Sequence, residues 1–568
     1  MARRGAAYPQ VEPGAAGLMD SRIAACAPGA SVARTLAVAR RADARWLAVG
    51  PSALVSTAAL ERAAGWGLGR LPVAAVAWRD VPAVTERTPE VAVRRRLAES
   101  AVPALRVRRG RRTVGAIDGA ALGMARPSLS VAHRLEHPAS PGGEACLWLL
   151  RLAGKLAETD GIAVYAVGGV VRDLLLDRSP LDVDLVVEGD GIAFARRLAP
   201  EIGGHVRAHA GFGTASIADG RSADGTALPR IDVATARRER YAAPGALPEV
   251  HAARLADDLA RRDFSVNALA LALLPGSFGR LVDVPGAQRD LARRRLRPLH
   301  PLSFVEDPTR IFRAARYAGR LGFRLDATGR RAVAVALAAA PYPALSGHRL
   351  LAEIALIAAD PHGWRTVCAH LLAWDALRLW DRRFRVGAAG RAHVATARRL
   401  DVWARRAEVG LDGTDVVLVA LLLAQPMSVV RASLARLAVT GERATRLAGA
   451  TAGARALARR VARAARPRPS QLDGVLAGRD PAALAAAWLA GGRVARRRIE
   501  WYLDRGRGVR PLLGGEDLVR MGVPRGPAVG RCLAELRRRR LDGAVSSLAS
   551  EQDFVNRWRE RAGKGESR

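Results

Sequence analysis

The spacing of apolar residues divides the chain into an α/β part and a helical part. Between about residues 144 and 285, short apolar runs interchange with amphipathic segments, which predicts the strands and helices of one mixed α/β domain. After Pro301 the apolar residues recur at helical spacing, broken by Pro and Gly, almost to the end of the chain. We therefore expect a multidomain protein in which an α/β domain precedes all-α domains.

Upstream of the α/β part, a unit of a helix, a strand, a turn and a strand occurs twice between about residues 18 and 125. The repeat period of roughly sixty residues is typical of a duplicated supersecondary unit. The helices are expected at 30–36 and 89–93, and the strands at 46–49, 54–56, 102–107 and 114–117. A stretch rich in Pro, Ser and Gly follows, without periodic apolar residues, and predicts a linker.

Two stretches in the α/β part carry the most specific chemistry. An apolar strand runs into Gly168-Gly169 and then a helix, so backbone amides with little side-chain obstruction face whatever binds there. In residues 181–187, strand alternation places Asp182 and Asp184 on one face, and the opposite, buried face is filled by Leu181, Val183, Leu185 and Val187. Two carboxylates beside a phosphate-binding turn indicate a divalent metal, although an isolated Asp-x-Asp is often only a solvated strand face.

With the Gly-Gly-x-x-Arg-Asp turn upstream of the Asp-x-Asp strand, the chain resembles the nucleotidyltransferase superfamily. More narrowly, it resembles the class II tRNA nucleotidyltransferases and the bacterial poly(A) polymerases, whose head is polymerase-β-like. The duplicated unit resembles a tandem pair of CBS modules. The parts that these resemblances imply are an N-terminal tail (1–18), a CBS-like pair (19–126), a linker (127–143), a nucleotidyltransferase head (144–285), a neck for base selection (286–358), a helical body (359–506) and a helical, RNA-binding tail (507–568).

Nucleotidyl transfer needs an attacking hydroxyl, an α-phosphate and a leaving pyrophosphate held in line, with their charge neutralised by metal. Asp182 and Asp184 are the predicted ligands of two Mg²⁺ ions, because carboxylate oxygens suit Mg²⁺ and substrate phosphates and water complete its shell. Asp232, on another apolar strand that could lie beside the first, is a third candidate catalytic carboxylate or else a strand-end cap.

The family resemblance also implies a set of nucleotide-binding residues. Residues 263–267 match the motif that selects ribose in the family, and we expect Asp263 or Ser265 to cap a helix there. The polar segment 237–248 is expected to be a mobile loop. The predicted nucleotide-binding residues are Gly168, Gly169, Arg172, Asp173, Arg262, Asp263, Asn267, Asp307, Arg310 and Arg313.

The last three of these residues offer a way to choose the base. They are expected along one helix face in the run Glu-Asp-x-x-Arg-x-x-Arg, which matches the base-selection motif of the class II enzymes. Adenine and cytosine each pair an exocyclic amino donor with a ring-nitrogen acceptor, and guanine and uracil present the opposite arrangement. The carboxylate of Asp307 and the guanidinium of Arg310 would therefore admit ATP and CTP as substrates. A salt-bridged surface helix is the simpler alternative.

Charge and cysteine usage indicate the kind of partner and the cellular compartment of the protein. The 568 residues include 90 Lys and Arg against 54 Asp and Glu, a formal net charge of +36, which favours a nucleic-acid partner. The four cysteines have neither pairing nor metal-ligand spacing, so we expect reduced thiols in a cytoplasmic protein. No apolar run is long enough to cross a membrane, and we expect no membrane partner.

Together these features predict an enzyme that adds CCA, or only the terminal A, to the 3′ end of tRNA. A poly(A) polymerase is the enzymatic alternative, and Ala210–Ala215 stands where those polymerases tend to carry a basic Gly-Arg-Arg-Phe-type block. A non-catalytic RNA-binding or nucleotide-sensing protein is the alternative of another class. The repeats could bind an adenine nucleotide with Asp118 at the ribose, or could instead serve homodimer formation or RNA docking.

Overall fold

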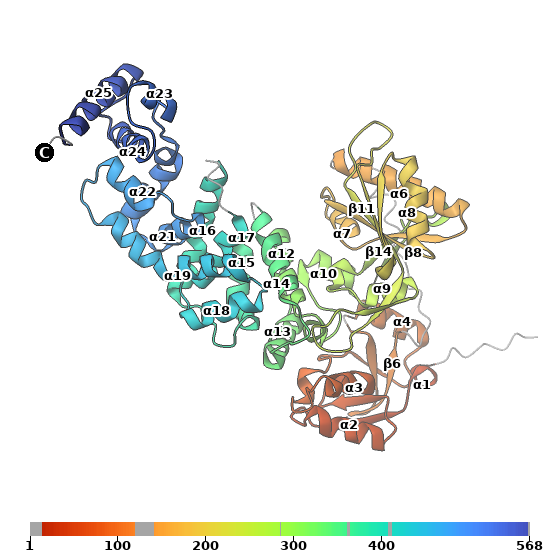
Figure 1. Ribbon diagram of the computed structural model, residues 1–568. Helices are drawn as coiled ribbons and strands as arrows, with labels where there is room; N and C mark the ends of the chain where they lie inside the picture. Colours follow the sequence, from red (N-terminus) through yellow and green to blue (C-terminus); the bar gives the residue numbers. More distant parts are fainter. Residues whose placement is uncertain are drawn as a thin grey trace, which may run out of the picture. The chain divides into compact units, whose positions relative to one another are not determined.

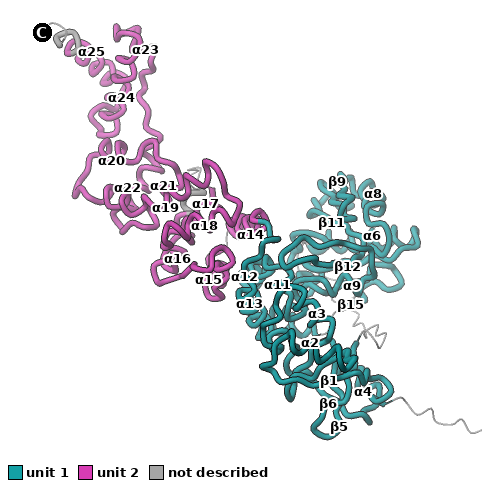
Figure 2. The backbone as a smooth tube through the Cα atoms, turned by 60° about the horizontal axis from the view of Figure 1, so that its bottom comes forward, with its two compact units in different colours: residues 1–346 teal, residues 347–568 magenta. Residues whose placement is uncertain are grey.

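The computed structural model describes residues 14–100, 102–119, 141–283, 286–360, 364–406 and 412–565, and the chain forms two compact units (Figures 1 and 2). Unit 1 comprises residues 1–346 and unit 2 residues 347–568. The boundary lies inside the predicted neck, and most of the predicted linker lies outside the described residues. Among the described residues, no helix is both long and apolar enough to cross a membrane.

The duplicated unit is confirmed, with one strand added before each helix. In the first repeat β1 pairs in parallel with β2, which pairs antiparallel with β3, and β4, β5 and β6 repeat this arrangement. Helix α1 lies in the predicted N-terminal tail, and its Ala15 is buried in the core of the second repeat. The elements are α1 (Ala15–Leu18), β1 (Ile23–Cys26), α2 (Val32–Arg41), β2 (Trp46–Val49), β3 (Ala53–Ser56), α3 (Thr57–Gly65), η1 (Val73–Ala75), β4 (Ala83–Thr85), α4 (Glu90–Glu99), β5 (Ala104–Arg109) and β6 (Arg112–Asp118).

A seven-stranded mixed sheet organises the predicted head, in the order β15-β14-β7-β8-β11-β10-β9 (Figure 1). Helices α6 and α8 pack against this sheet and against each other. The elements are α6 (Pro141–Thr159), β7 (Ala163–Val167), α7 (Gly169–Leu175), β8 (Asp182–Glu188), α8 (Gly191–Glu201), β9 (His205–His209), η2 (Ala210–Phe212), β10 (Thr214–Ala218), β11 (Arg230–Thr235), β12 (Arg237–Arg240), β13 (Glu249–Ala252), α9 (Leu255–Ala260), η3 (Ser265–Asn267), β14 (Leu269–Ala272), η4 (Pro275–Ser277) and β15 (Leu281–Asp283).

The predicted alternation along β8 is confirmed except at its first position. Val183 and Leu185 are buried, and Val186 on the opposite face packs with α9 through Leu255. The two aspartates of β8 share the face of Val186, since side chains two apart lie on one side of a strand. The prediction for Leu181 was wrong, because β8 begins one residue later and leaves this side chain 66% exposed.

Two other local predictions differ from the structure. Residues 265–267 form one 3₁₀ turn, and the expected helix is the buried strand β14, because a continuous apolar run cannot distinguish a buried strand from a helix. The segment 237–248, expected as a mobile loop, begins with β12, which pairs antiparallel with β13 directly after the segment.

The first part of the predicted neck is helical apart from the two-residue strands β16 and β17, which pair in parallel. Asp307 does not lie on a helix face as predicted, because the helix breaks at Pro308 and leaves Asp307 extended. Proline lacks an N–H and disfavours helical backbone in the preceding residue. The elements are α10 (Ala287–Ala292), β16 (Arg295–Leu296), α11 (Ser303–Glu306), α12 (Thr309–Leu321), β17 (Arg324–Leu325) and α13 (Ala327–Ala339).

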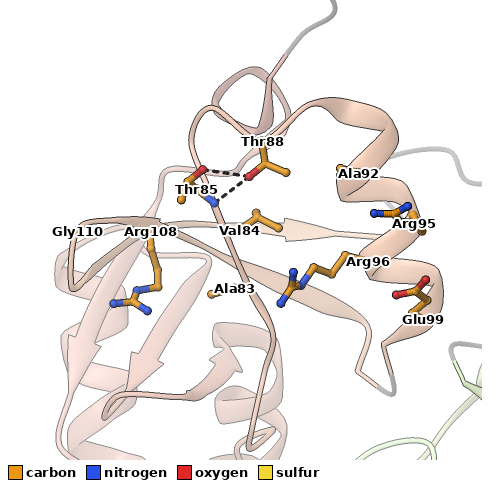
Figure 3. Close-up of a pocket in the computed structure, with 10 residues that line it drawn as sticks. All are labelled: Ala83, Val84, Thr85, Thr88, Ala92, Arg95, Arg96, Glu99, Arg108 and Gly110. Atoms are coloured by element: carbon orange, nitrogen blue, oxygen red, sulfur yellow. Dashed lines mark hydrogen bonds between the residues drawn. The ribbon is translucent and has the colours of Figure 1, made fainter.

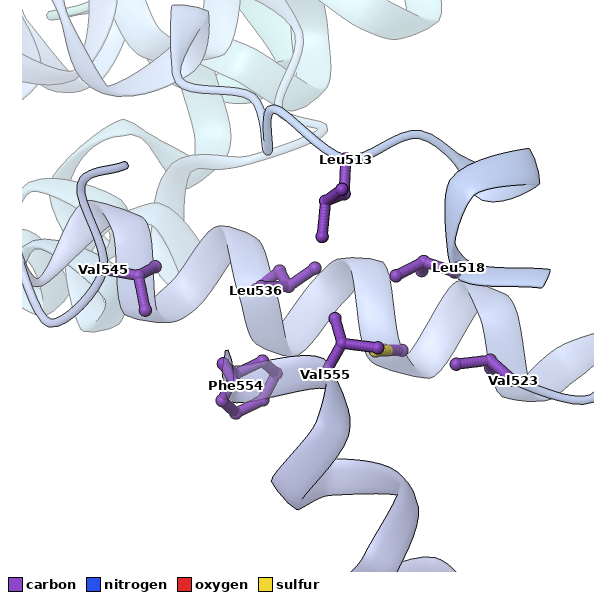
Figure 4. Close-up of a cluster of buried hydrophobic side chains, with 8 residues drawn as sticks. Leu513, Leu518, Val523, Leu536, Val545, Phe554 and Val555 are labelled. Atoms are coloured by element: carbon purple, nitrogen blue, oxygen red, sulfur yellow. The ribbon is translucent and has the colours of Figure 1, made fainter. Parts of the chain in front are cut away.

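Unit 2 is helical, as predicted. Helices α17 and α21 are apolar on nearly all sides and lie in its interior, where α19 packs against both. At the end of the chain α23, α24 and α25 form a core of their own around Leu518, Leu536 and Val555 (Figure 4). The elements are α14 (Gly347–Ala359), α15 (Trp364–Ala373), η5 (Ala376–Leu379), α16 (Ala388–Arg406), α17 (Gly413–Leu422), α18 (Met427–Arg436), α19 (Gly441–Ala462), α20 (Pro469–Leu476), α21 (Pro481–Ala490), α22 (Arg493–Asp504), η6 (Gly506–Gly508), α23 (Gly515–Arg520), α24 (Pro527–Leu541) and α25 (Leu548–Gly565).

Candidate active site

Charged side chains surround the two glycines, Gly168 and Gly169, at the turn between β7 and α7. Gly168 has a positive φ of 74°, and a Cβ placed there would lie 2.6 Å from Arg262 Nη1 and 3.4 Å from Asp184 Oδ2. A Cβ on Gly169 would lie 3.7 Å from Asp182 Oδ1. Because glycine has no side chain, a cradle is left open between the aspartates of β8 and Arg262. Arg262 is itself held by an ion pair, with Nη2 3.0 Å from Asp258 Oδ2.

Asp184 is the more buried of the two aspartates. Burial, helped by the neighbouring charges of Asp182 and Asp232, raises its pKa to about 6 against the lowering effect of Arg262. Asp232 lies opposite Asp184 because β11 pairs in parallel with β8. The carboxylate of Asp232 also accepts hydrogen bonds from Ser216 Oγ at 2.6 Å and Arg230 Nη2 at 2.7 Å. The three predicted catalytic carboxylates thus lie on adjacent strands, and Asp232 is the one already paired.

Four further predicted residues form a hydrogen-bonded chain that is buried except at its last member, Arg313. Arg172 Nη1 donates to Asn267 Oδ1 at 2.6 Å, and Asn267 Nδ2 donates to Asp263 Oδ1 at 2.9 Å. Arg313 Nε completes the chain with a bond to Asp263 Oδ2 at 2.8 Å. Burial alone would raise the pKa of Asp263, but the charge of Arg313 and the bond from Asn267 lower it. Arg172 also forms a buried, two-pronged pair with Asp173, so these two residues brace Asn267 from within the fold.

Arg310 is buried at the start of α12, with its guanidinium held by neighbours from three segments. Nη1 donates to Ser303 Oγ at 2.7 Å, and Nη2 donates to the Arg261 carbonyl at 2.9 Å and to the Tyr241 hydroxyl at 3.3 Å. Asp307 lies at the helix break and accepts from Thr309 N at 3.0 Å. The structure thus brings Asp307 and Arg310 to one place, although by a break in the helix and not by a shared helix face.

The sequence prediction missed several residues that hold this site together. Glu239 and Tyr241 belong to the segment that its polar composition assigned to a mobile loop, yet Tyr241 donates to Glu239 Oε2 at 3.0 Å and reaches Arg310. Glu239 also pairs with Arg261 at 2.6 Å. A buried glutamate, Glu306, stands next to Asp307. The alternating charges of the hairpin strand were the only local signal, and such charges are usually solvated.

Comparison with known proteins places this geometry in a family. Residues 164–297 match the poly A polymerase head domain. A CC-adding tRNA nucleotidyltransferase of Deinococcus radiodurans is 35% identical over 420 residues, which cover 72% of this chain and 93% of that enzyme. The chain belongs to the class II tRNA nucleotidyltransferase family. An A-adding tRNA nucleotidyltransferase of Geobacter sulfurreducens is 34% identical over 417 residues, but this chain spans only 46% of its length.

Solved structures agree with this family assignment. A Thermotoga maritima CCA-adding enzyme complexed with tRNA covers 75% of this chain at 27% identity and a TM-score of 0.60, with 98% of that enzyme matched. A CCA-adding enzyme in complex with CTP covers 77% of this chain at 26% identity and a TM-score of 0.63, with 100% of that enzyme matched. The predicted mixed α/β head and helical remainder are therefore confirmed as the fold of the tRNA nucleotidyltransferases.

The side chains around the glycine cradle are of the kind that binds Mg²⁺, the ion that the sequence analysis expects here. Among the described residues, no group of three or more His, Cys, Asp or Glu side chains is placed to hold a metal by itself. The two carboxylates beside the glycine cradle suit Mg²⁺, because this ion keeps several waters and is usually held by one or two carboxylates together with substrate phosphates.

The raised pKa of Asp184 predicts that this carboxylate destabilises the metal-free protein at neutral pH. The folded chain binds the proton below about pH 6, whereas an unfolded aspartate releases it near its ordinary pKa of 3.8. The destabilisation is therefore complete above pH 6 and is relieved as the pH falls from 6 to 4. In EDTA at pH 7, Asp184→Asn should raise the free energy of unfolding by about 1 to 3 kcal/mol. Urea unfolding at pH 7 and pH 4 measures this gain, which should vanish at pH 4; a gain that is equal at both values would contradict the assignment.

Proposed function

We propose that this tRNA nucleotidyltransferase adds nucleotides to the 3′ end of tRNA from ATP and CTP, without a template and with release of pyrophosphate. The observation that carries the proposal is the convergence of Asp182, Asp184 and Arg262 on the Gly168-Gly169 turn. These groups match what the reaction needs, which is two metal-binding carboxylates, a cation for the triphosphate and an approach that no side chain obstructs.

Each group has a distinct task in this proposal. Asp182 and Asp184 would hold two Mg²⁺ ions, which when bound neutralise the triphosphate and activate the attacking 3′ hydroxyl. Arg262 lies beside the cradle and would bind triphosphate oxygens. The Asp263–Asn267 pair, braced by Arg172 from one side, would position the ribose. Asp232 would act through Asp184 across the paired strands, as a positioning residue.

Base choice would rest on Asp307 and Arg310. The carboxylate accepts from the amino group of adenine or cytosine, and the guanidinium donates to the adjacent ring nitrogen. The contacts of Arg310 with Ser303, Tyr241 and the Arg261 carbonyl hold the guanidinium in one orientation. A rigid donor of this kind rejects guanine and uracil, since either base would leave buried polar groups unpaired.

One assay tests the activity and separates its variants. Purified full-length protein is given tRNA transcripts that lack A, CA or CCA, with each labelled nucleotide in turn. Addition limited to the missing nucleotides supports the proposal and shows whether the product is CCA, CC or A. Long adenosine tails on unrelated RNA would support the poly(A) polymerase alternative. Absence of any Mg²⁺-dependent incorporation, with tRNA binding retained, would favour a non-catalytic RNA-binding protein.

In this proposal, the C-terminal helices α23, α24 and α25 would contact the tRNA backbone. A groove of about 450 Å³ lies between α24 and α25 in unit 2. Its aromatic residues are Phe554 and Trp558, and Arg539 stacks on Phe554 at 4.8 Å. The other lining residues are Arg531, Glu535, Arg557 and Arg561. Four guanidiniums around Trp558 suit phosphates and an unstacked base, while Phe554 is buried beneath Arg539.

Removal of one cation from this groove should weaken tRNA binding and reduce its salt dependence. We expect Arg557→Ala to lower tRNA affinity several-fold and to reduce the slope of log K against log salt by about 1, since one phosphate contact is lost. Filter binding between 50 and 300 mM KCl provides the measurement. Arg383→Ala, which removes an exposed arginine paired with Asp381, serves as the matched control. Equal slopes for the two variants would exclude the groove.

A second candidate function belongs to the second repeat, for which we infer a phosphate-bearing nucleotide ligand. A cavity of about 360 Å³ is lined there by Arg95, Arg96 and Arg108, with Glu99 beside them (Figure 3). Asp118, the residue expected at a ribose, does not line this cavity and lies 3.7 Å from Arg45. The arginines would bind the phosphates and Glu99 the ribose hydroxyls. CBS-like nucleotide binding, homodimer formation and a cytoplasmic location stay predictions.

This ligand can be tested without the transferase reaction. We expect ATP or AMP to bind the full chain a second time, at a site that Arg96→Ala weakens at least about fivefold while binding at the head is unchanged. Calorimetry on protein that also carries Asp184→Asn distinguishes binding at the second repeat from binding at the head. A single site in the wild type, or an Arg96→Ala isotherm equal to the wild type, would overturn the inference.

A further inference from the structure

We propose that Arg62, on α3 of the first repeat, is a positioning residue for the base-selecting segment 306–310. The inference rests on the proposed function, because it assigns the N-terminal repeats a part in how the head and neck choose a nucleotide. Arg62 would not touch substrate. It would act through Glu306, the residue directly before Asp307.

The contact itself spans 244 positions of the chain. Arg62 Nη1 donates to Glu306 Oε1 at 2.8 Å, and α3 lies beside α11 (Figure 2). The arginine side chain is 45% exposed, whereas that of Glu306 is only 7% exposed. Arg62 therefore comes from the surface of the repeat and neutralises a carboxylate buried in the neck.

The two carboxylate oxygens of Glu306 face different partners. Oε1 faces Arg62, while Oε2 accepts from His300 Nε2 at 2.9 Å and lies 3.9 Å from Arg310 Nη1. Burial would raise the pKa of Glu306, but His300, Arg310 and Arg62 together lower it to about 2. The carboxylate is thus ionised throughout the physiological range, and Arg62 determines which oxygen is left for Arg310.

The backbone of Glu306 is held as well. Its carbonyl accepts from Gly245 N at 2.9 Å, in the connection between β12 and β13. A Cβ on Gly245, whose φ is +79°, would lie 2.8 Å from Leu345 Cβ, so the chain passes closely there. Glu306 consequently joins the repeat, the hairpin that carries Tyr241 and the start of the helix that carries Arg310.

Two further contacts attach the repeats to the rest of unit 1, so the Arg62 contact is part of a wider interface. The η1 turn packs against α13 of the neck. Arg289 Nη1, on α10, donates to the carbonyl of Glu99 at 2.7 Å. Attachment at several places keeps α3 beside α11, so loss of Arg62 alone should alter the charge at Glu306 without detaching the repeat.

Loss of Arg62 should change nucleotide choice through Arg310. Without its Oε1 partner, the buried carboxylate gains by turning toward Arg310, the nearest remaining guanidinium. That movement competes with the bonds from Arg310 to Ser303 and to the Arg261 carbonyl. The guanidinium then loses its single orientation, and discrimination against GTP and UTP falls.

The experiment compares Arg62→Ala with Arg40→Ala in the full chain. Arg40 provides a matched control because it is an exposed arginine of the same repeat, with only a 3.5 Å pair to Glu61. We expect Arg62→Ala to raise KM for the correct nucleotide and to lower the ratio of kcat/KM for ATP over GTP at least threefold, with KM for tRNA unchanged. Arg62→Lys should restore most of the ratio, since it returns the charge.

Hydrogen exchange provides a readout that does not need activity. Amides of 303–313 should exchange faster in Arg62→Ala than in the wild type or Arg40→Ala, and the effects of Arg62→Ala and Glu306→Gln on the ATP to GTP ratio should not add. Unchanged exchange, or faster exchange with an unchanged ratio, would overturn the proposal. If the wild type incorporates no nucleotide at all, the proposed function fails, and unchanged nucleotide affinity in Arg62→Ala would then reject the positioning role separately.

Discussion

Asp182→Asn and Asp184→Asn should each lower Mg²⁺-dependent incorporation by at least about 10³-fold while tRNA affinity stays within twofold of the wild type. Each change replaces a carboxylate with an amide of the same shape at the glycine cradle, so it removes charge and leaves the packing. Single-turnover incorporation of labelled ATP into a tRNA that lacks its terminal A measures the rate, and filter binding measures the affinity.

The matched control for this prediction is Asp219→Asn. Asp219 is an exposed aspartate of the same domain with a positive φ of 63°, a conformation that Asn accepts readily. It should incorporate nucleotide at the wild-type rate. Wild-type incorporation by Asp182→Asn or Asp184→Asn would remove the metal assignment. A parallel loss of tRNA binding would point instead to a misfolded head, which the increased stability expected for Asp184→Asn argues against.

Substitution of Arg310 should relax base choice more than it lowers activity. Arg310→Lys keeps the charge but loses the planar donor geometry that Ser303, Tyr241 and the Arg261 carbonyl hold. We expect the preference for ATP over GTP to fall about 10- to 100-fold, because a buried hydrogen bond to the base is lost and its partner is no longer selected. Competition between labelled ATP and unlabelled GTP measures the preference.

Arg324→Lys provides the control for Arg310→Lys, because Arg324 is an exposed arginine on β17 of the same neck. Its preference for ATP should equal that of the wild type. Arg310→Lys enzyme that discriminates as well as this control would assign base choice to other groups. If Arg310→Lys lowers tRNA affinity and leaves the preference for ATP over GTP unchanged, Arg310 binds tRNA and does not select the base.

Much of the site was readable from short-range sequence because the chemistry is local. Gly168-Gly169 and the alternating aspartates of β8 each lie within a few residues, and periodicity assigns their faces. The strand that carries Asp232 was expected beside the first, and pairing places Asp232 opposite Asp184. The type of one element was less predictable. Strand β14 was expected as a helix, since an apolar run alone does not distinguish a buried strand from a helix.

The sequence by itself determined the order of an α/β part before a helical part, the duplicated repeat, the strongly basic character and the glycine turn before the alternating aspartates, because each rests on composition or on spacing within one element. The metal-binding and nucleotide-binding roles of individual residues stay predictions. Only the tertiary structure decided which groups neutralise one another across the chain. Glu306 meets Arg62 over 244 positions, and Tyr241 reaches Arg310 from a separate hairpin. Such pairs depend on how elements pack, and a charge on a strand or helix face carries no local sign of its distant partner.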